Sequence, residues 1–215
     1  MEHEIQTTTS DHALTGVDSA VNEKFTMFGL GYINSKGVAV LAARPKMTVD
    51  IPYVYRYIRE GWAEQQTSEL VRLLPSTDND EQQTFKKLNF ETVTFAGRFR
   101  YRNRGGLIER TPFMVLDLDH LGNTERARKV QQTLINDPEI ETVLSFLSPR
   151  QEGIKWVIRI PHRLSGMTYR EQAEAMGRYV GYWHGLEVDV AKEENRTCYL
   201  PSDPECYINP KYLQR

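Results

Sequence analysis

The sequence has few cysteines and no long run of apolar residues. Its 215 residues include two cysteines, Cys198 and Cys206, close together in a proline-rich stretch. Without a second pair they cannot complete a zinc site, and two free thiols suit a reduced interior. The longest apolar runs fall well short of the roughly 20 residues that span a bilayer. These absences argue against a zinc-finger module and a membrane protein, and they predict a cytoplasmic chain.

An excess of charge of one sign is also missing. The chain has 27 lysines and arginines against 29 acidic residues, which gives a net charge of -2 at pH 7. Such a balance argues against a protein that coats nucleic acid indiscriminately. Basic residues are nevertheless concentrated in one stretch, at Lys86, Lys87, Arg98, Arg100, Arg102, Arg104 and Arg110. This cluster predicts a local basic surface.

Length and composition fit a single globular domain behind a short tail. Residues 1–24 are polar and acidic and lack the apolar core of a signal peptide, so we predict a disordered tail. The chain is 40% hydrophobic and 26% charged, and it is long enough to bury a core. We predict one domain over residues 25–215, with an N-terminal part at 25–110 and a core part, which carries the candidate site, at 111–215.

Hydrophobic periodicity predicts an α/β (α+β) fold. In the N-terminal part we expect two short strands around a turn at 34–37, two helices between 51 and 74 separated at Gly61, a loop at 76–83 and one strand at 90–101. From residue 112 we expect a strand, a helix at 125–136, strands at 140–147 and 154–160, a helix at 168–185 and a short strand at 188–190. This order predicts a mixed sheet with helices packed on one face.

Two carboxylates close the apolar run at 113–116. Because side chains alternate along a strand, Asp117 and Asp119 are expected to project from the same face. Two like charges side by side are costly to bury unless a cation neutralises them, and carboxylate oxygens are the ligands that Mg²⁺ or Mn²⁺ prefers. The pair therefore predicts a metal site. The alternative is that one aspartate caps the following helix and the other is solvated.

A third acid, Asp189, follows the last predicted helix, where a short strand can return it beside the first two. Three carboxylates suffice to hold two divalent ions roughly 3.5 to 4 Å apart for phosphoryl transfer. The alternative is that Asp189 ends a strand or caps a turn.

Three arginines, Arg98, Arg100 and Arg102, recur at every second position of the predicted strand at 90–101 and its end. On a strand they share a face, and a stripe of one sign favours contact with phosphates of a nucleic-acid backbone or of a triphosphate. The alternative is a solvated edge strand that is kept from aggregating by its charge.

Taken together, these motifs resemble the archaeo-eukaryotic primase (primase-polymerase) superfamily. Its pattern is a DxD motif, a turn that leads into a strand with a polar residue, and a later hydrophobic-Asp motif. More narrowly, the chain is similar to the primase-like domain at the N-terminus of virulence-associated protein E-like replication proteins of mobile elements. The segments that carry this likeness are Thr94–Phe99, Asn195–Pro204 and Tyr207–Pro210, and it covers about 51–210. It implies an RRM-like catalytic core with an N-terminal α/β extension.

The resemblance implies roles for individual residues. Asp117, Asp119 and Asp189 match the metal-binding and catalytic aspartates. Ser148 and Lys155 match the second motif, where the superfamily has a histidine in place of Lys155. Residues expected to bind the nucleotide are Ser148, Arg150, Lys155 and Arg196. The turn departs from the family by having Arg150-Gln151 in place of Ser-Gly, whereas His120 and His162 are expected only to form local hydrogen bonds.

The function that follows from this resemblance is template-dependent nucleotidyl transfer. It implies Mg²⁺ or Mn²⁺ as cofactor, nucleoside triphosphates as substrates, a single-stranded DNA template and a helicase as partner. Arg98, Arg100 and Arg102 are expected to follow the nucleic-acid backbone. The substituted turn and Lys155 favour a second hypothesis, a catalytically silent nucleotide-binding or nucleic-acid-binding module of a replication protein. A third is an unrelated DxD enzyme, such as a nuclease or a glycosyltransferase.

Overall fold

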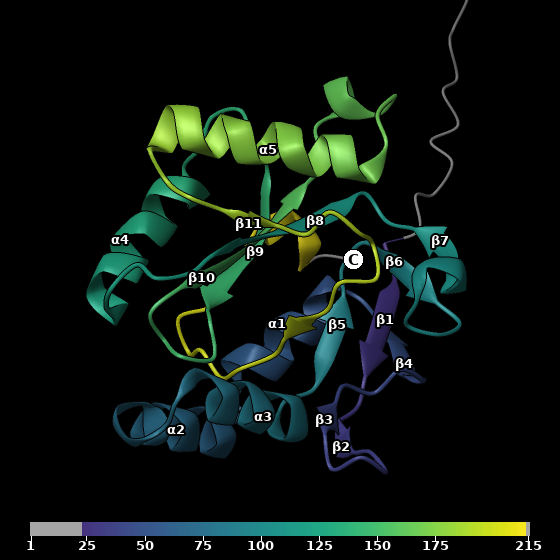
Figure 1. Cartoon of the computed structure of the whole chain (residues 1–215). Coiled ribbons are helices and arrows are strands. Elements are labelled where there is room, and N and C mark those ends of the chain that lie inside the picture. The colour runs from purple at the N-terminus through teal and green to yellow at the C-terminus, as the bar shows by residue number, and fades with distance from the viewer. Residues whose placement is uncertain (1–22, 214–215) are drawn as a thin grey trace, which may run out of the picture.

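Helices and antiparallel sheets alternate along the chain in the computed structural model, which describes residues 23–213 (Figure 1). The α-helices are α1 (Ile51–Arg59), α2 (Glu64–Leu73), α3 (Asn79–Asn89), α4 (Thr124–Ile135) and α5 (Tyr169–His184). Short 3-10 turns are η1 (Leu74–Ser76), η2 (Arg104–Gly106), η3 (His162–Leu164) and η4 (Pro210–Tyr212). The predicted α/β (α+β) class is confirmed. The predicted tail lies, apart from its last two residues, outside the described part of the chain.

A five-stranded sheet forms the centre of the C-terminal half. Its order is β11 (Asp189–Val190), β8 (Phe113–Leu118), β10 (Ile154–Arg159), β9 (Thr142–Leu147) and β13 (Tyr207–Ile208). Every neighbouring pair is antiparallel, so the prediction of a mixed sheet is wrong. The reason is that β10 inserts between β8 and β9, which separates the two parallel strands joined by α4.

A four-stranded antiparallel sheet forms the N-terminal half, in the order β12 (Cys198–Tyr199), β5 (Thr92–Thr94), β1 (Phe25–Phe28) and β4 (Pro45–Val49). Two hairpins accompany it, β2 (Tyr32–Ile33) with β3 (Ala39–Val40), and β6 (Gly97–Phe99) with β7 (Leu107–Arg110). The hairpin around 34–37 agrees with the prediction. The single strand expected at 90–101 is wrong, because the chain turns at 95–96 and pairs β5 with β1 but β6 with β7.

In the N-terminal half, two helices lie where the sequence predicts them, and a third was not predicted. Helices α1 and α2 are separated at Gly61, which has a φ of 75°, as expected from the glycine. The loop expected at 76–83 is wrong, because α3 begins at Asn79. Asp78 caps it, and the side chain of Glu81 accepts a hydrogen bond from the Asp78 backbone in return. The acidic residues that suggested a loop are thus the cap and first turn of a helix.

Both faces of the five-stranded sheet are covered. Met114, Leu116 and Trp156 pack under α4 and α5, whereas Phe113 and Val115 point to the other face and pack with α1 and the four-stranded sheet. Figure 1 shows α4 and α5 on one side of the sheet and α1, α2 and α3 on the other. The prediction of helices on one face, made from the elements after residue 112, is therefore confirmed for α4 and α5, and α1 of the N-terminal half covers the other face. No helix within residues 23–213 is long and apolar enough to cross a membrane.

Candidate functional site

The end of β8 carries the two aspartates of the DxD motif. Lys155 on β10 lies directly opposite Asp117 in the antiparallel register. Its Nζ forms an ion pair with the Asp117 carboxylate and lies 3.7 Å from Oδ1 of Asp119. Because a single ammonium contacts both carboxylates, Asp117 and Asp119 lie on the same side of the sheet. Since this is the face of Val115, the pair points towards the N-terminal half.

The third acid reaches the same place through strand pairing. Asp189 on the edge strand β11 is the register partner of Asp117 on β8. Its carboxylate is held by Arg196, with Nη1 at 3.2 Å from Oδ1 and Nη2 in a shorter contact with Oδ2. The structure therefore brings Asp189 beside Asp117, with Arg196 as its counter-ion.

A cavity of about 650 Å³ opens over these residues, between the five-stranded sheet and α3. This volume lies in the range of small-molecule binding sites. Its charged lining consists of Lys86, Arg102, Asp117, Asp119, Arg150, Lys155, Asp189 and Arg196. Ser148, His120 and Tyr199 line it as well, whereas His162 lies in η3 and lines a different pocket. One cavity thus combines a carboxylate cluster with several cations.

Burial sets the electrostatics of the central ion pair. Burial raises the pKa of Asp117, although the neighbouring Lys155 opposes this shift. Burial also lowers the pKa of Lys155, but Asp117 and Asp119 outweigh it and hold that pKa above its usual value. Lys155 is therefore protonated and compensates the buried carboxylate. Oδ1 of Asp117 is buried and has no hydrogen-bond partner, so its hydrogen-bonding capacity is unused.

The donor chemistry of this cluster fits a hard divalent cation, because it offers carboxylate oxygens and one of them is unpartnered. In the conformation described, however, no group of three His, Cys, Asp or Glu side chains within residues 23–213 is arranged to hold an ion. In this conformation Lys155 forms ion pairs with Asp117 and Asp119, and Arg196 forms one with Asp189. A cation bound to these oxygens would compete with both side chains.

The turn between β9 and β10 supplies two further candidate residues. Ser148 is buried, and its backbone N–H donates to the carbonyl of Gly153 at 2.8 Å. Arg150 donates from Nη2 to Oδ1 of Asn79 on α3 at 2.6 Å, while its Nε is buried without a partner. Gln151 has a φ of 62°, the left-handed conformation that the glycine expected there adopts readily. The turn is therefore held against α3 at the cavity.

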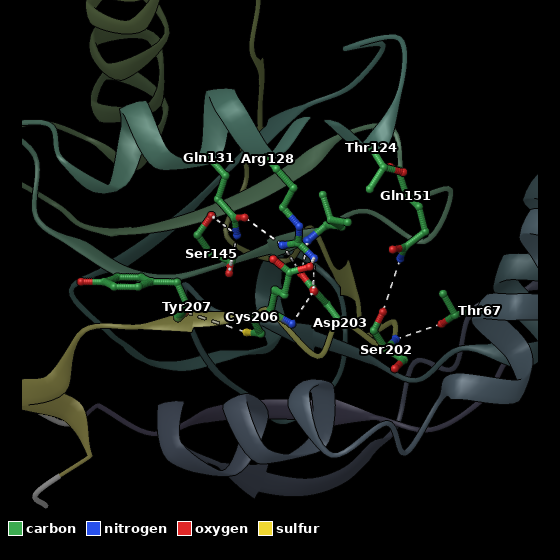
Figure 2. A network of polar contacts seen from close by, with 12 residues as sticks. Thr67, Thr124, Arg128, Gln131, Ser145, Gln151, Ser202, Asp203, Cys206 and Tyr207 are labelled. Atoms are coloured by element: carbon green, nitrogen blue, oxygen red, sulfur yellow. Dashed lines mark hydrogen bonds and ion pairs between the residues drawn. The ribbon is translucent and has the colours of Figure 1, made fainter. Parts of the chain in front are cut away.

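A network of polar contacts holds this turn in place (Figure 2). Gln151 donates to the carbonyl of Ser202 at 3.3 Å, and its own carbonyl accepts from the hydroxyl of Thr124 at 2.9 Å. Asp203, which has no exposed surface, accepts from the backbone N–H of Leu147 at 2.8 Å and forms an ion pair with Arg128 of α4. The segment that carries Asp203 thus positions the end of β9, where the turn begins.

The three alternating arginines do not form one surface. Because β6 ends before Arg100, the chain bends there and the strand alternation is lost. Arg98 pairs with Glu109 at 2.7 Å, and Arg100 is exposed. Arg102 donates to the backbone carbonyls of 41–42 and is the only one of the three that lines the cavity. The predicted single-face stripe is therefore wrong.

One cavity residue, Lys86, was not assigned a role from the sequence. It lies on α3, with Nζ 5.6 Å from the centroid of the Tyr199 ring. The signal that could have placed it is the Asp78–Glu81 capping box, which predicts a helix where the polar composition suggested a loop.

Comparison with known proteins identifies a family. The family model described as BT4734-like, N-terminal domain, matches residues 84–208, which is more than half of the chain. The matched region runs from α3 to β13 and contains every charged residue that lines the cavity. No curated protein and no solved structure gives a significant match.

Proposed function

This chain belongs to the BT4734-like N-terminal domain family, and within that family we propose that it is a template-dependent nucleotidyltransferase of the primase-polymerase type. The observation that carries the proposal is the composition of a single cavity. Three aspartates line it at the edge of the sheet, together with cations from α3, the β9–β10 turn, β10 and the segment after β11. A nucleoside triphosphate with a divalent ion presents the complementary charges.

The aspartates would hold Mg²⁺ or Mn²⁺ in this proposal. When bound, the ions supply charge neutralisation and polarise the reacting oxygens. Asp117 contributes an oxygen that is already buried and unpartnered. Since the ion would take over the neutralisation of the carboxylates, Lys155 and Arg196 become available to the triphosphate.

The remaining residues bind and orient the nucleotide. Arg150 and Lys155 supply charge to the phosphates, and Ser148 supplies a hydroxyl donor at the cavity wall. The reaction joins a 3'-hydroxyl oxygen to the α-phosphorus, breaks the bond to pyrophosphate and passes the hydroxyl proton to solvent. Arg102 at the cavity is the arginine best placed to contact the template or primer backbone. The resemblance to primase-polymerases supports a single-stranded DNA template and a helicase partner, and the two free cysteines suit a cytoplasmic setting.

Primer synthesis and extension with labelled nucleotides test this function directly. The assay contains a single-stranded DNA template, all nucleoside triphosphates and either Mg²⁺ or Mn²⁺. The wild-type chain is expected to give labelled product, and the variant with both Asp117→Ala and Asp119→Ala is expected to give none. Glu125→Gln, which changes an exposed carboxylate outside the cavity, is the matched control. Equal product from the wild type and the double variant refutes the proposal.

A second candidate is favoured by the ion pair between Lys155 and Asp117. That pair neutralises the central carboxylate without a metal, as expected in a module that binds nucleotides but does not join them. Calorimetry separates the two candidates. Nucleotide binding of equal strength with and without divalent metal, together with no product in the extension assay, supports the binding module. Degradation of the single-stranded template in Mn²⁺ points instead to a nuclease.

A further inference from the structure

Lys86 approaches the cavity from the side opposite the aspartates. It projects from α3, is partly buried, and has its ammonium over the ring of Tyr199 on β12. No carboxylate within residues 23–213 forms an ion pair with it, in contrast to Lys155 and Arg196. A lysine that serves only to cover apolar surface extends its ammonium into water, whereas this one directs it into a polar cavity.

Two other cations converge with Lys86. The pKa of Lys86 is lowered to about 8, chiefly by burial and then by the nearby cations Arg150 and Lys155, against the opposing influence of Asp119 and Asp117. Lys155 is compensated by two carboxylates, whereas Arg150 donates to the neutral amide oxygen of Asn79. Positive charge is therefore in excess on the α3 side of the cavity, and a polyanion would relieve it.

We propose that Lys86 is a phosphate-binding residue, which together with Arg150 binds the triphosphate from the α3 side, opposite the aspartates. This inference rests on the proposed function, in which the cavity takes a nucleoside triphosphate. It adds that α3, outside the five-stranded sheet, forms half of the phosphate site. It also assigns the ring of Tyr199 as the surface that orients the Lys86 ammonium.

Calorimetry with three ligands tests the assignment. Inorganic tripolyphosphate is titrated without metal, and ATP and adenosine are titrated in the presence of Mg²⁺. Loss of one charge-assisted hydrogen bond is expected to weaken binding of tripolyphosphate and ATP by about ten- to a hundredfold in Lys86→Met. Adenosine affinity is expected to stay within about twofold, because it has no phosphate. Lys87→Met is the matched control, since Lys87 is the next residue on α3 and does not line the cavity. It is expected to bind all three ligands like the wild type.

The outcomes separate this inference from the proposed function. If the wild type binds ATP and Lys86→Met binds it equally well, the role of Lys86 is wrong while nucleotide binding stands. If the wild type binds neither ATP nor tripolyphosphate, the proposed function fails and the inference fails with it. Lys86→Arg and Lys86→Gln form a second pair for the case in which Lys86→Met does not fold. Arginine is expected to retain affinity and glutamine to lose it, and equal affinities overturn the proposal.

Discussion

Single residues in the cavity differ mainly in what neutralises them. Asp117 has Lys155 and Asp189 has Arg196, so each of these two carboxylates has a counter-ion. The strand period predicted that Asp117 and Asp119 share a side. That Lys155 stands opposite Asp117 could not be predicted in the same way, because it depends on the register between two strands far apart in the sequence.

Lys86 gives the cavity a pH dependence that can be measured. Its pKa is lowered to about 8 by burial and by Arg150 and Lys155, while Asp117 and Asp119 oppose the shift. The group is charged below this pKa and neutral above it, whereas a terminal phosphate with a last pKa of about 6, as in ATP with Mg²⁺, is ionised above pH 7. The affinity for ATP in Mg²⁺ is therefore expected to fall as the pH rises from 7 to 9.5. A bound anion raises the pKa of Lys86, which places the midpoint above 8.

Calorimetric titrations at half-unit intervals of pH provide the measurement. Lys86→Arg is the control, because arginine stays charged throughout this range. Its affinity is expected to change little with pH. A wild-type profile as flat as that of the arginine variant contradicts the assignment of the titration to Lys86.

At the scale of secondary structure, the predictions were accurate where periodicity was strong. The strands and helices between residues 112 and 190, and α1 and α2, lie close to where apolar spacing placed them, whereas β12 and β13 were not predicted. The errors fall where helix capping or strand pairing, and not local composition, decides the structure. The polar segment before Lys86 became a helix through its cap, and the arginine-bearing stretch broke because β5 and β6 pair with different partners. Pairing partners are long-range information that local periodicity does not contain.

The cap of α3 carries a testable contribution to stability. Asp78 accepts from the backbone N–H of Glu81 at 2.8 Å, and Glu81 accepts from that of Asp78 at 3.2 Å. Asp78→Ala is expected to lower the free energy of unfolding by about 1 kcal/mol. Urea denaturation measures the loss. Asp80→Ala is the matched control, because Asp80 lies in the first turn and makes no cap contact. Equal losses in the two variants would show that the cap does not stabilise α3.

At the scale of the whole molecule, the two parts predicted from the sequence are joined more closely than their boundary at 110 suggests. The C-terminal segment crosses back, because β12 pairs with β5 in the N-terminal sheet and β13 pairs with β9 in the other. One core contains residues of both sheets and of α1. The cavity lies where the parts meet, so its α3 wall and its aspartates come from different halves. Local sequence patterns predict the elements that form each wall, but they do not predict that the two walls lie next to each other.

Asp203 holds this junction together. Its carboxylate is fully buried and binds Arg128 of α4 and the N–H of Leu147, and its own N–H donates to the carbonyl of Ile58 on α1 at 3.0 Å. Asp203→Ala leaves the Arg128 guanidinium without its close counter-ion. Removing one partner of a buried pair is expected to lower the free energy of unfolding by about 3 to 5 kcal/mol.

Glu205→Ala is the matched control for the Asp203 substitution. Its carboxylate lies 3.8 Å from the same guanidinium but its side chain is 78% exposed, and exposed pairs contribute about 1 kcal/mol or less. Chemical denaturation compares the two variants, and tripolyphosphate binding below the unfolding transition tests whether the β9–β10 turn is still positioned. Because Asp203 fixes the end of β9, its loss is expected to weaken binding as well, whereas Glu205→Ala leaves it unchanged. Similar stabilities in the two variants would mean that the shared apolar core, and not this ion pair, holds the N-terminal and C-terminal halves together.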